Sequence, residues 1–215
     1  MSLIQYNQKR NFNSTPEPTG GRTKAEQLIF VVQKHHASNL HYDFRLEIDG
    51  VLKSWAVPKG PSVDPSVKRL AMMVEDHPYD YKDFEGVIGE GNYGAGTVIV
   101  WDKGIYEPLV DVRSKKAREK LLLKQIKEGS IKFRLEGKKL HGEFALVRTT
   151  YSKNSWLLIK HKDEYAAETD ITEQAESVIS GKKLEDFAKN GRPKRHALDT
   201  ASRQSVRSVA IKKKT

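Results

Sequence analysis

The chain has 215 residues, of which 37% are hydrophobic, and this is enough for one domain of ordinary size with a real core. It has no cysteine, which excludes disulfides and thiolate metal sites, and no apolar stretch long enough for a secretory signal or a membrane span. The net charge of +10 is concentrated near the C-terminus, because residues 189–215 carry nine Lys/Arg and one acid while the remainder carries +2. We therefore expect a cytoplasmic protein with no membrane segment and a basic tail, which either attracts nucleic acid or only aids solubility.

The first half of the chain begins with an arm and a hairpin. Residues 1–26 are polar and rich in Pro, Gly and Thr, which predicts an irregular arm. The apolar run 28–35 predicts a strand, and the period-two alternation of 40–48 predicts a half-buried strand. Asp49-Gly50 then joins it to a further strand at 51–57, and this dipeptide is typical of a type I′ turn because both central residues need a positive φ.

The rest of the chain alternates further strands with one clear helix. Prolines mark a loop after residue 57, residues 69–75 predict a strand, and 96–109 predict a strand, a turn and a short strand. Helix-forming residues with leucines at helical spacing predict a helix over 113–129. The remaining predicted elements are strands at 130–137, 139–149 and 155–163 and a helix at 172–189. Many adjacent short strands with one or two helices predict a mainly β (α+β) fold, an antiparallel barrel or sandwich with helices outside.

One face of the strand at 40–48 combines residue types that suit metal and phosphate binding. His41, Asp43 and Arg45 alternate with apolar residues and so share a face. An imidazole and a carboxylate suit a divalent transition ion, and His35 or His36 would supply a third ligand. Arg45 is always charged and would bind a phosphate with its planar fork. The alternative is an exposed ladder of ion pairs, which the pattern alone does not exclude.

Two further segments strengthen the case for a site that binds an anion. In "VEDHPYDYKDFEG" (74–86), Glu75, His77 and Tyr81 lie close together in sequence, although a capped turn would explain the segment equally well. In "GEGNYGAG" (89–96), four of eight residues are glycine, so the backbone of this loop can approach a phosphate closely. A tight turn between strands explains these glycines as well, and the loop lacks the Gly-Lys-Ser/Thr of a P-loop.

With these residues in place, the chain resembles the 3′-phosphoesterase module of bacterial and archaeal DNA ligase D, which also occurs as a free-standing protein. The resemblance covers residues 9–188 and is carried by "FVVQKHHASNLHYDFRLEIDGVLKSWAVPKGPS", "EDHPYDYKDFEG", "GNYGAGTVIVWDKG" and "WLLIKHKD". It implies a compact antiparallel β-barrel with one or two flanking helices. The chain would then consist of an N-terminal arm that contributes to the active site (1–26), a phosphoesterase barrel (27–188) and a flexible basic tail (189–215).

The resemblance also implies an activity. Such enzymes use Mn²⁺ to remove a terminal 3′ ribonucleoside and then hydrolyse the remaining 3′-phosphate, which leaves a 3′-hydroxyl for non-homologous end joining repair. The expected partners are DNA or primer-template 3′ ends, with a separate repair polymerase and ligase, and we expect a monomer. Two alternatives stay open: a non-catalytic nucleic-acid-binding module, and a metal phosphodiesterase that acts on small nucleotides.

Carried over position by position, the resemblance assigns roles to twelve residues. The implied metal ligands are His35, His41 and Asp43, which selects His35 over His36. The implied phosphate contacts are Arg45, His77 and Tyr81, and we expect His77 to be protonated. The implied supporting residues are Arg10, Glu17, Gln33, Lys59, Arg69 and Glu75.

The sequence departs from the family pattern in the arm. Asn11 stands where an aspartate is usual, and it keeps a hydrogen-bond acceptor but loses the charge. This difference would weaken the phosphomonoesterase step if the usual carboxylate orients water or an arginine. Gly89 stands where proline is frequent, and this affects only the stiffness of the loop. The chain has no Lys-x-Asp-Gly sequence, so we expect no ligation of ends.

Overall fold

The computed structural model describes residues 3–21 and 26–191, with side chains described up to residue 187. The basic tail predicted for 189–215 lies almost wholly outside these residues. Among the described residues, no helix is both long enough and apolar enough to span a bilayer.

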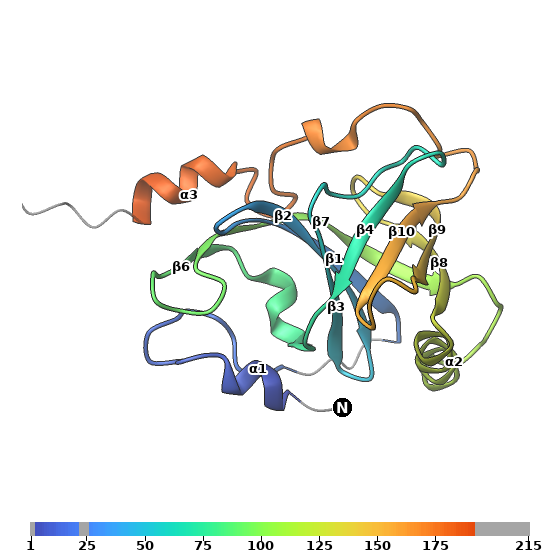
Figure 1. Cartoon of the computed structure of the whole chain (residues 1–215), viewed down its shortest axis with the longest axis horizontal. Coiled ribbons are helices and arrows are strands. Elements are labelled where there is room, and N and C mark those ends of the chain that lie inside the picture. Colours follow the sequence, from blue (N-terminus) through green and yellow to red (C-terminus); the bar gives the residue numbers. More distant parts are fainter. Residues whose placement is uncertain (1–2, 22–25, 192–215) are drawn as a thin grey trace, which may run out of the picture.

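Eight antiparallel strands close into a barrel, which confirms the predicted fold class (Figure 1). Their order is β1-β2-β3-β4-β10-β9-β8-β7, and pairing of β1 with β7 closes the ring. The barrel strands are β1 (Leu28–His36), β2 (Leu40–Ile48), β3 (Val51–Val57), β4 (Lys68–Met73), β7 (Gly96–Pro108), β8 (Ser130–Glu136), β9 (His141–Arg148) and β10 (Ser155–Lys160). Two short strands extend the sheet, β5 (His77–Pro78) beside β3 and β6 (Gly86–Ile88) beside β7.

Three α-helices and two 3₁₀ helices accompany the strands in the described residues. They are α1 (Ile4–Gln8), α2 (Lys115–Glu128), α3 (Leu184–Gly191), η1 (Tyr79–Asp83) and η2 (Ile171–Glu173). α2 packs beside β8, and α3 packs beside β6 and β7 (Figure 1). The segment predicted as an irregular arm therefore contains a short helix, and the helix predicted over 172–189 is η2 followed by α3.

The β2–β3 hairpin has the predicted turn. Asp49 and Gly50 have φ values of 55° and 77°, the positive values that a type I′ turn needs. This two-residue turn fixes the register, so Arg45 lies opposite Ser54.

The prediction of a turn within 96–109 is wrong, because β7 runs without interruption over 13 residues. The interior of this strand contains one glycine, Gly104. A Cβ on Gly104 would lie only 2.0 Å from the carbonyl oxygen of Glu136, so glycine is needed here for close approach to β8. Asp102 accepts backbone N–H donors from the turn between β8 and β9.

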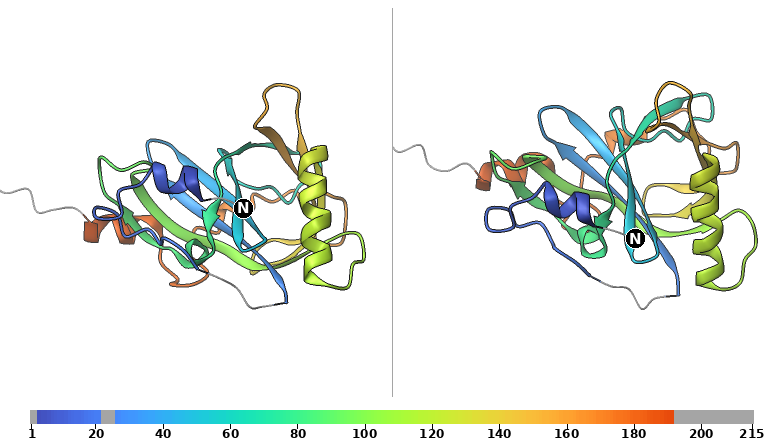
Figure 2. Two further views of the ribbon diagram at one scale, coloured as in Figure 1. Left: turned by 90° about the horizontal axis from the view of Figure 1, so that it is seen from below. Right: turned by 60° about the horizontal axis from the view of Figure 1, so that its bottom comes forward.

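The sheet formed by β1, β2, β3 and β7 is buried on both faces. Its inner face packs in the barrel core, which includes all three tryptophans. Its outer face carries a second core, in which Val31 and Val98 meet Tyr6 of α1 and Tyr81 of η1. Figure 2 shows the dark-blue α1 beside η1, and the rings of Tyr6 and Tyr81 are 6.2 Å apart.

The prediction of a half-buried β2 is therefore wrong. Asp43, Arg45 and Glu47 lie on the face that was expected to be solvated, yet they are only 8%, 2% and 0% exposed. Tyr81 of η1 covers Arg45, and Lys115 of α2 pairs with Glu47, so these polar side chains of β2 lie in a protein interior. Charged groups in such a place must be paired with one another or with a ligand.

Candidate active site

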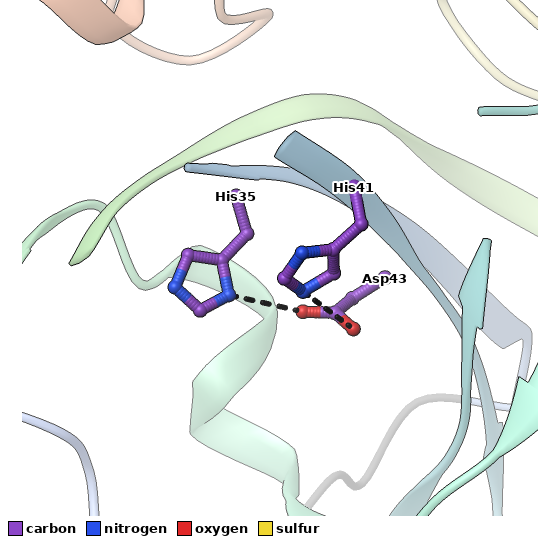
Figure 3. Close-up of side chains that lie close together, drawn as sticks. All are labelled: His35, His41 and Asp43. Atoms are coloured by element: carbon purple, nitrogen blue, oxygen red, sulfur yellow. Dashed lines mark ion pairs between the residues drawn. The ribbon is translucent and has the colours of Figure 1, made fainter. Parts of the chain in front are cut away.

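His35, His41 and Asp43 converge at one end of the β1–β2 pair (Figure 3). His35 lies directly opposite His41, because the antiparallel register of β1 and β2 pairs these two residues. Their candidate ligand atoms all lie within 4.8 Å of one another. The carboxylate of Asp43 is 3.7 Å from Nδ1 of His35 and 3.9 Å from Nε2 of His41. His36 alternates to the other face of β1 and is exposed, so the structure brings only the first histidine of the pair to the cluster.

The chemistry of this donor set fits a divalent transition ion. A backbone carbonyl only accepts hydrogen bonds, so the contact of 3.0 Å between Nδ1 of His41 and the carbonyl of Asn39 places the proton on Nδ1. Nε2 of His41 then faces Asp43 with a free lone pair, as metal-bound histidines do. In His35 the nitrogen that faces Asp43 is Nδ1, whereas Nε2 lies on the far side of the ring (Figure 3). Two imidazoles and one carboxylate would leave coordination positions open for a substrate.

Asp43 is held in its charged form by its neighbours. Burial by itself would raise the pKa of this carboxyl group, but the positive charge of Arg45 outweighs burial and holds the pKa well below its ordinary range. Asp43 is therefore ionised at neutral pH and can serve as a ligand.

Arg45 is anchored beside Asp43 by a fixed set of hydrogen bonds. Its Nε donates to Gln33 at 2.9 Å, Nη1 donates to Ser54 at 2.8 Å, and Nη2 donates to Asp43 at 3.2 Å. The guanidinium also lies 4.9 Å from the centre of the Tyr81 ring. These contacts occupy three of its five N–H donors, so the two others remain for a ligand in the pocket that Arg45 lines. Gln33 also donates to two backbone carbonyls near η1, which fixes its own orientation.

The N-terminal arm supplies the opposite wall of the site. Arg10 donates to Glu17 at 2.8 Å, to Glu75 at 3.4 Å and to His77 at 3.3 Å. Glu17 also accepts from the hydroxyl of Tyr81 at 3.0 Å. The structure thus brings together five of the residues that the resemblance singled out, although the arm is far from the others in sequence.

The hydrogen bonds of His77 fix its protonation. An arginine can only donate, so Nε2 of His77 accepts from Arg10, and Nδ1 carries the proton and donates to the carbonyl of Glu75 at 2.9 Å. Burial, and then the positive charges of Arg45 and Arg10, lower the pKa of His77 well below its ordinary value. The structure contradicts the expected protonated His77, because a neutral ring is the form that satisfies both contacts.

The neutral His77 predicts a stability that depends on pH. In the unfolded chain a histidine has a pKa of about 6.5, whereas the folded protein holds the pKa of His77 far lower. The unfolded state therefore binds more protons below about pH 6.5, and we expect the free energy of unfolding to fall between about pH 7 and 5. His77→Gln should make this dependence shallower by up to about 1.4 kcal/mol per pH unit, as measured by urea unfolding. The control is His161→Gln, which changes a partly exposed histidine, and equal slopes for the two variants would contradict the prediction.

These groups surround a pocket of about 300 Å³. Its lining residues are Arg10, His35, Ala37, His41, Asp43, Arg45, Ala56, Val74, Glu75, His77, Tyr81, Ile88, Tyr93 and Gly94. Gln33 and Glu17 are buried behind the lining, where they hold Arg45, Arg10 and Tyr81. A larger pocket, of about 370 Å³, lies near β8 and β9, and two of its charged residues, Arg134 and Glu143, pair with each other.

Besides Glu17 and Gln33, two further residues implied by the resemblance are not part of this lining. Lys59 is exposed in the turn that follows β3, and Arg69 lies in β4 opposite Leu158 of β10. Their proposed support of activity remains a prediction.

Several residues of the site were missed by sequence reasoning. Ser54 donates to the carbonyl of Leu52, accepts from Arg45 and lies 3.2 Å from Nδ1 of His77. The hairpin register that places it opposite Arg45 could have identified it. Tyr6 packs 3.8 Å from the guanidinium of Arg10, and no pattern in the arm marks it.

The comparison with known proteins points to one family. Residues 33–148 match the family model described as DNA Ligase D 3′-phosphoesterase domain. The multifunctional non-homologous end joining protein LigD of Pseudomonas aeruginosa is 49% identical over 191 residues, which make up 85% of this chain and 22% of that protein. The corresponding DNA repair protein of Mycobacterium tuberculosis is 41% identical over 173 residues, 78% of this chain and 21% of that protein. The chain thus spans about a fifth of the length of these curated relatives.

Proposed function

Because the chain belongs to the DNA ligase D 3′-phosphoesterase domain family, we propose that it is a metal-dependent hydrolase that processes 3′ ends of DNA during repair. The observation that carries the proposal is the cluster of His35, His41 and Asp43 in one pocket with Arg10 and Arg45. A metal and two guanidiniums beside each other suit a phosphate ester, whose reaction adds negative charge at the phosphate oxygens. The relatives that carry this domain are non-homologous end joining proteins, which supports a role in that pathway.

The proposed substrates are DNA or primer strands that end in a 3′ ribonucleoside or a 3′-phosphate. The enzyme would remove the nucleoside as a phosphodiesterase and the phosphate as a phosphomonoesterase, and so provide a 3′-hydroxyl for a polymerase and a ligase. Manganese is the proposed ion, since mixed imidazole and carboxylate ligands suit divalent transition ions. The protein would act as a cytoplasmic monomer alongside those partner enzymes.

The residues of the pocket suggest how they act. A divalent ion held by His35, His41 and Asp43 would polarise a phosphate oxygen as a Lewis acid. Arg45 is held rigidly and would donate its two remaining N–H groups to the phosphate, so no reorganisation is needed as charge develops. Neutral His77 accepts a hydrogen bond from Arg10 at Nε2 and would thereby orient this guanidinium toward the phosphate. Glu17 and Gln33 would act as positioning residues for the two arginines.

The decisive experiment is an end-processing assay with several metals. We expect the full chain to release nucleoside and then phosphate from a primer that ends in a ribonucleotide, with Mn²⁺ but not with a chelator. Binding of the primer without any hydrolysis would instead support a non-catalytic nucleic-acid-binding module, and this binding should weaken with salt. Turnover of small nucleotide diesters but not of primers would support the small-substrate phosphodiesterase. Hydrolysis of 3′-phosphate ends in the same assay shows whether the monoesterase step persists with Asn11.

A further inference from the structure

Tyr93 is an exposed aromatic residue at the mouth of the pocket. It is 50% exposed and lies in the glycine-rich loop between β6 and β7. Among the exposed large hydrophobic side chains of the described residues, it is the one that also lines the pocket beside His35 and His41. It takes part in neither of the two hydrophobic cores described above, so packing of the fold does not account for it.

The loop holds Tyr93 in a defined place next to the metal-binding histidines. Gly94, the next residue, passes so close to His35 that an added Cβ would lie 3.8 Å from that ring. On the other side, the amide of Asn92 accepts from the hydroxyl of Ser14 at 2.7 Å and donates to the carbonyl of Ser14 at 3.3 Å. The loop that carries Tyr93 is therefore held by the N-terminal arm and lies beside His35.

Two cationic side chains of the N-terminal arm, Lys9 and Arg10, lie close to the ring of Tyr93. Nζ of Lys9 lies 4.5 Å from the ring centre and donates to the hydroxyl at 3.4 Å, and the guanidinium of Arg10 lies 5.7 Å from the ring centre. Lys9 is itself held by Glu75 at 3.0 Å. The arm and the glycine-rich loop thus meet at Tyr93 and form a rim on this side of the pocket.

We propose that Tyr93 stacks on the base of the terminal 3′ nucleoside, the group that leaves when the diester is cleaved. An exposed ring that is fixed next to a phosphate site is the arrangement by which proteins hold unpaired bases without regard to sequence. The ring stands at the edge of the pocket, where the arm and the loop meet, next to the groups that would hold the phosphate. Tyr93 then makes the site favour ends that carry a nucleoside over ends that carry only a phosphate. The inference rests on the proposed function and deepens it by naming the part of the substrate that this side chain recognises.

The test compares three ends on one primer: a terminal adenosine, a terminal ribose that lacks the base, and a 3′-phosphate. We expect Tyr93→Ala to lower kcat/KM for the adenosine end by about tenfold or more, chiefly through KM. The same variant should leave the base-free and phosphate ends within about twofold of wild type, because neither offers a base for stacking. Tyr93→Phe keeps the ring and should retain wild-type activity on all three ends. The matched control is Tyr151→Ala, which removes a tyrosine that is 91% exposed in the turn after β9.

The outcomes separate this inference from the proposed function. A wild-type protein that cleaves none of the three ends with any metal overturns the proposed function and the inference with it. If wild type is active and Tyr93→Ala slows all ends equally, or none, the stacking role alone is wrong. A loss in Tyr93→Phe equal to that in Tyr93→Ala would also overturn it, since the hydroxyl group and not the ring would then be responsible.

Discussion

His41→Ala is expected to weaken metal binding and to slow hydrolysis strongly. The substitution removes one of three candidate ligands, and the two that remain, His35 and Asp43, would hold an ion far more weakly. The loss of the polarised phosphate oxygen should lower kcat/KM by about 10²- to 10³-fold or more. Calorimetric titration with Mn²⁺ and turnover of a ribonucleotide-ended primer would measure the two effects separately.

The chain offers a matched control one residue from the cluster. His36 neighbours His35 in β1 but is exposed on the other face, so His36→Ala should keep metal affinity and rate near those of wild type. Circular dichroism and urea unfolding would show that His41→Ala is still folded, which is expected because His41 is only partly buried. If His41→Ala binds Mn²⁺ and cleaves primers as wild type does, the assignment of this cluster as the metal site is wrong.

Arg45→Met is expected to reduce stability as well as activity. The substitution keeps much of the side-chain volume but leaves the buried carboxylate of Asp43 without its strongest cation, and Gln33 and Ser54 without a donor. Removal of one partner from a buried ion pair costs about 3–5 kcal/mol. Loss of a fixed charge at the phosphate should also lower the rate by about 10²-fold or more. Urea unfolding and primer turnover at saturating metal would give the two values.

A surface arginine provides the comparison for Arg45. Arg134 pairs with Glu143 at 2.7 Å, but their side chains are 57% and 30% exposed, so Arg134→Met should leave the urea midpoint close to that of wild type. Arg45→Lys restores the positive charge without the planar fork, and we expect it to recover part of the stability but little of the activity. Equal stability of Arg45→Met and wild type would show that the buried network does not hold Asp43 in place.

The pocket is formed by segments that are distant in sequence. Arg10 and His77 are 67 residues apart in the chain, yet they are in hydrogen-bond contact across the pocket. Through this contact, Arg10 holds the N-terminal arm against the pocket. The contact also explains why His77 is neutral, since its Nε2 accepts from a permanent cation and its Nδ1–H is used by the backbone.

Part of this site could be predicted from local sequence. Alternation in 40–48 places His41, Asp43 and Arg45 on one face, and Asp49-Gly50 fixes the turn that follows. Both signals are local, because a strand repeats every two residues and a type I′ turn depends on two backbone angles. The resemblance in the sequence also identified the family correctly.

Only the tertiary structure decided which segments cover the polar face of β2 and which histidine of β1 lies beside it. Nothing in the alternation of β2 shows that η1 and α2 pack against its polar side, so a strand expected to be half-buried is buried on both faces. Spacing left His35 and His36 as equal choices, whereas the register of β1 against β2 brings His35 to His41. The physical reason is that periodicity reports only which side chains share a face. The burial, partners and protonation of those side chains depend on contacts between distant segments, and these exist only once the barrel has closed and the arm has packed against it.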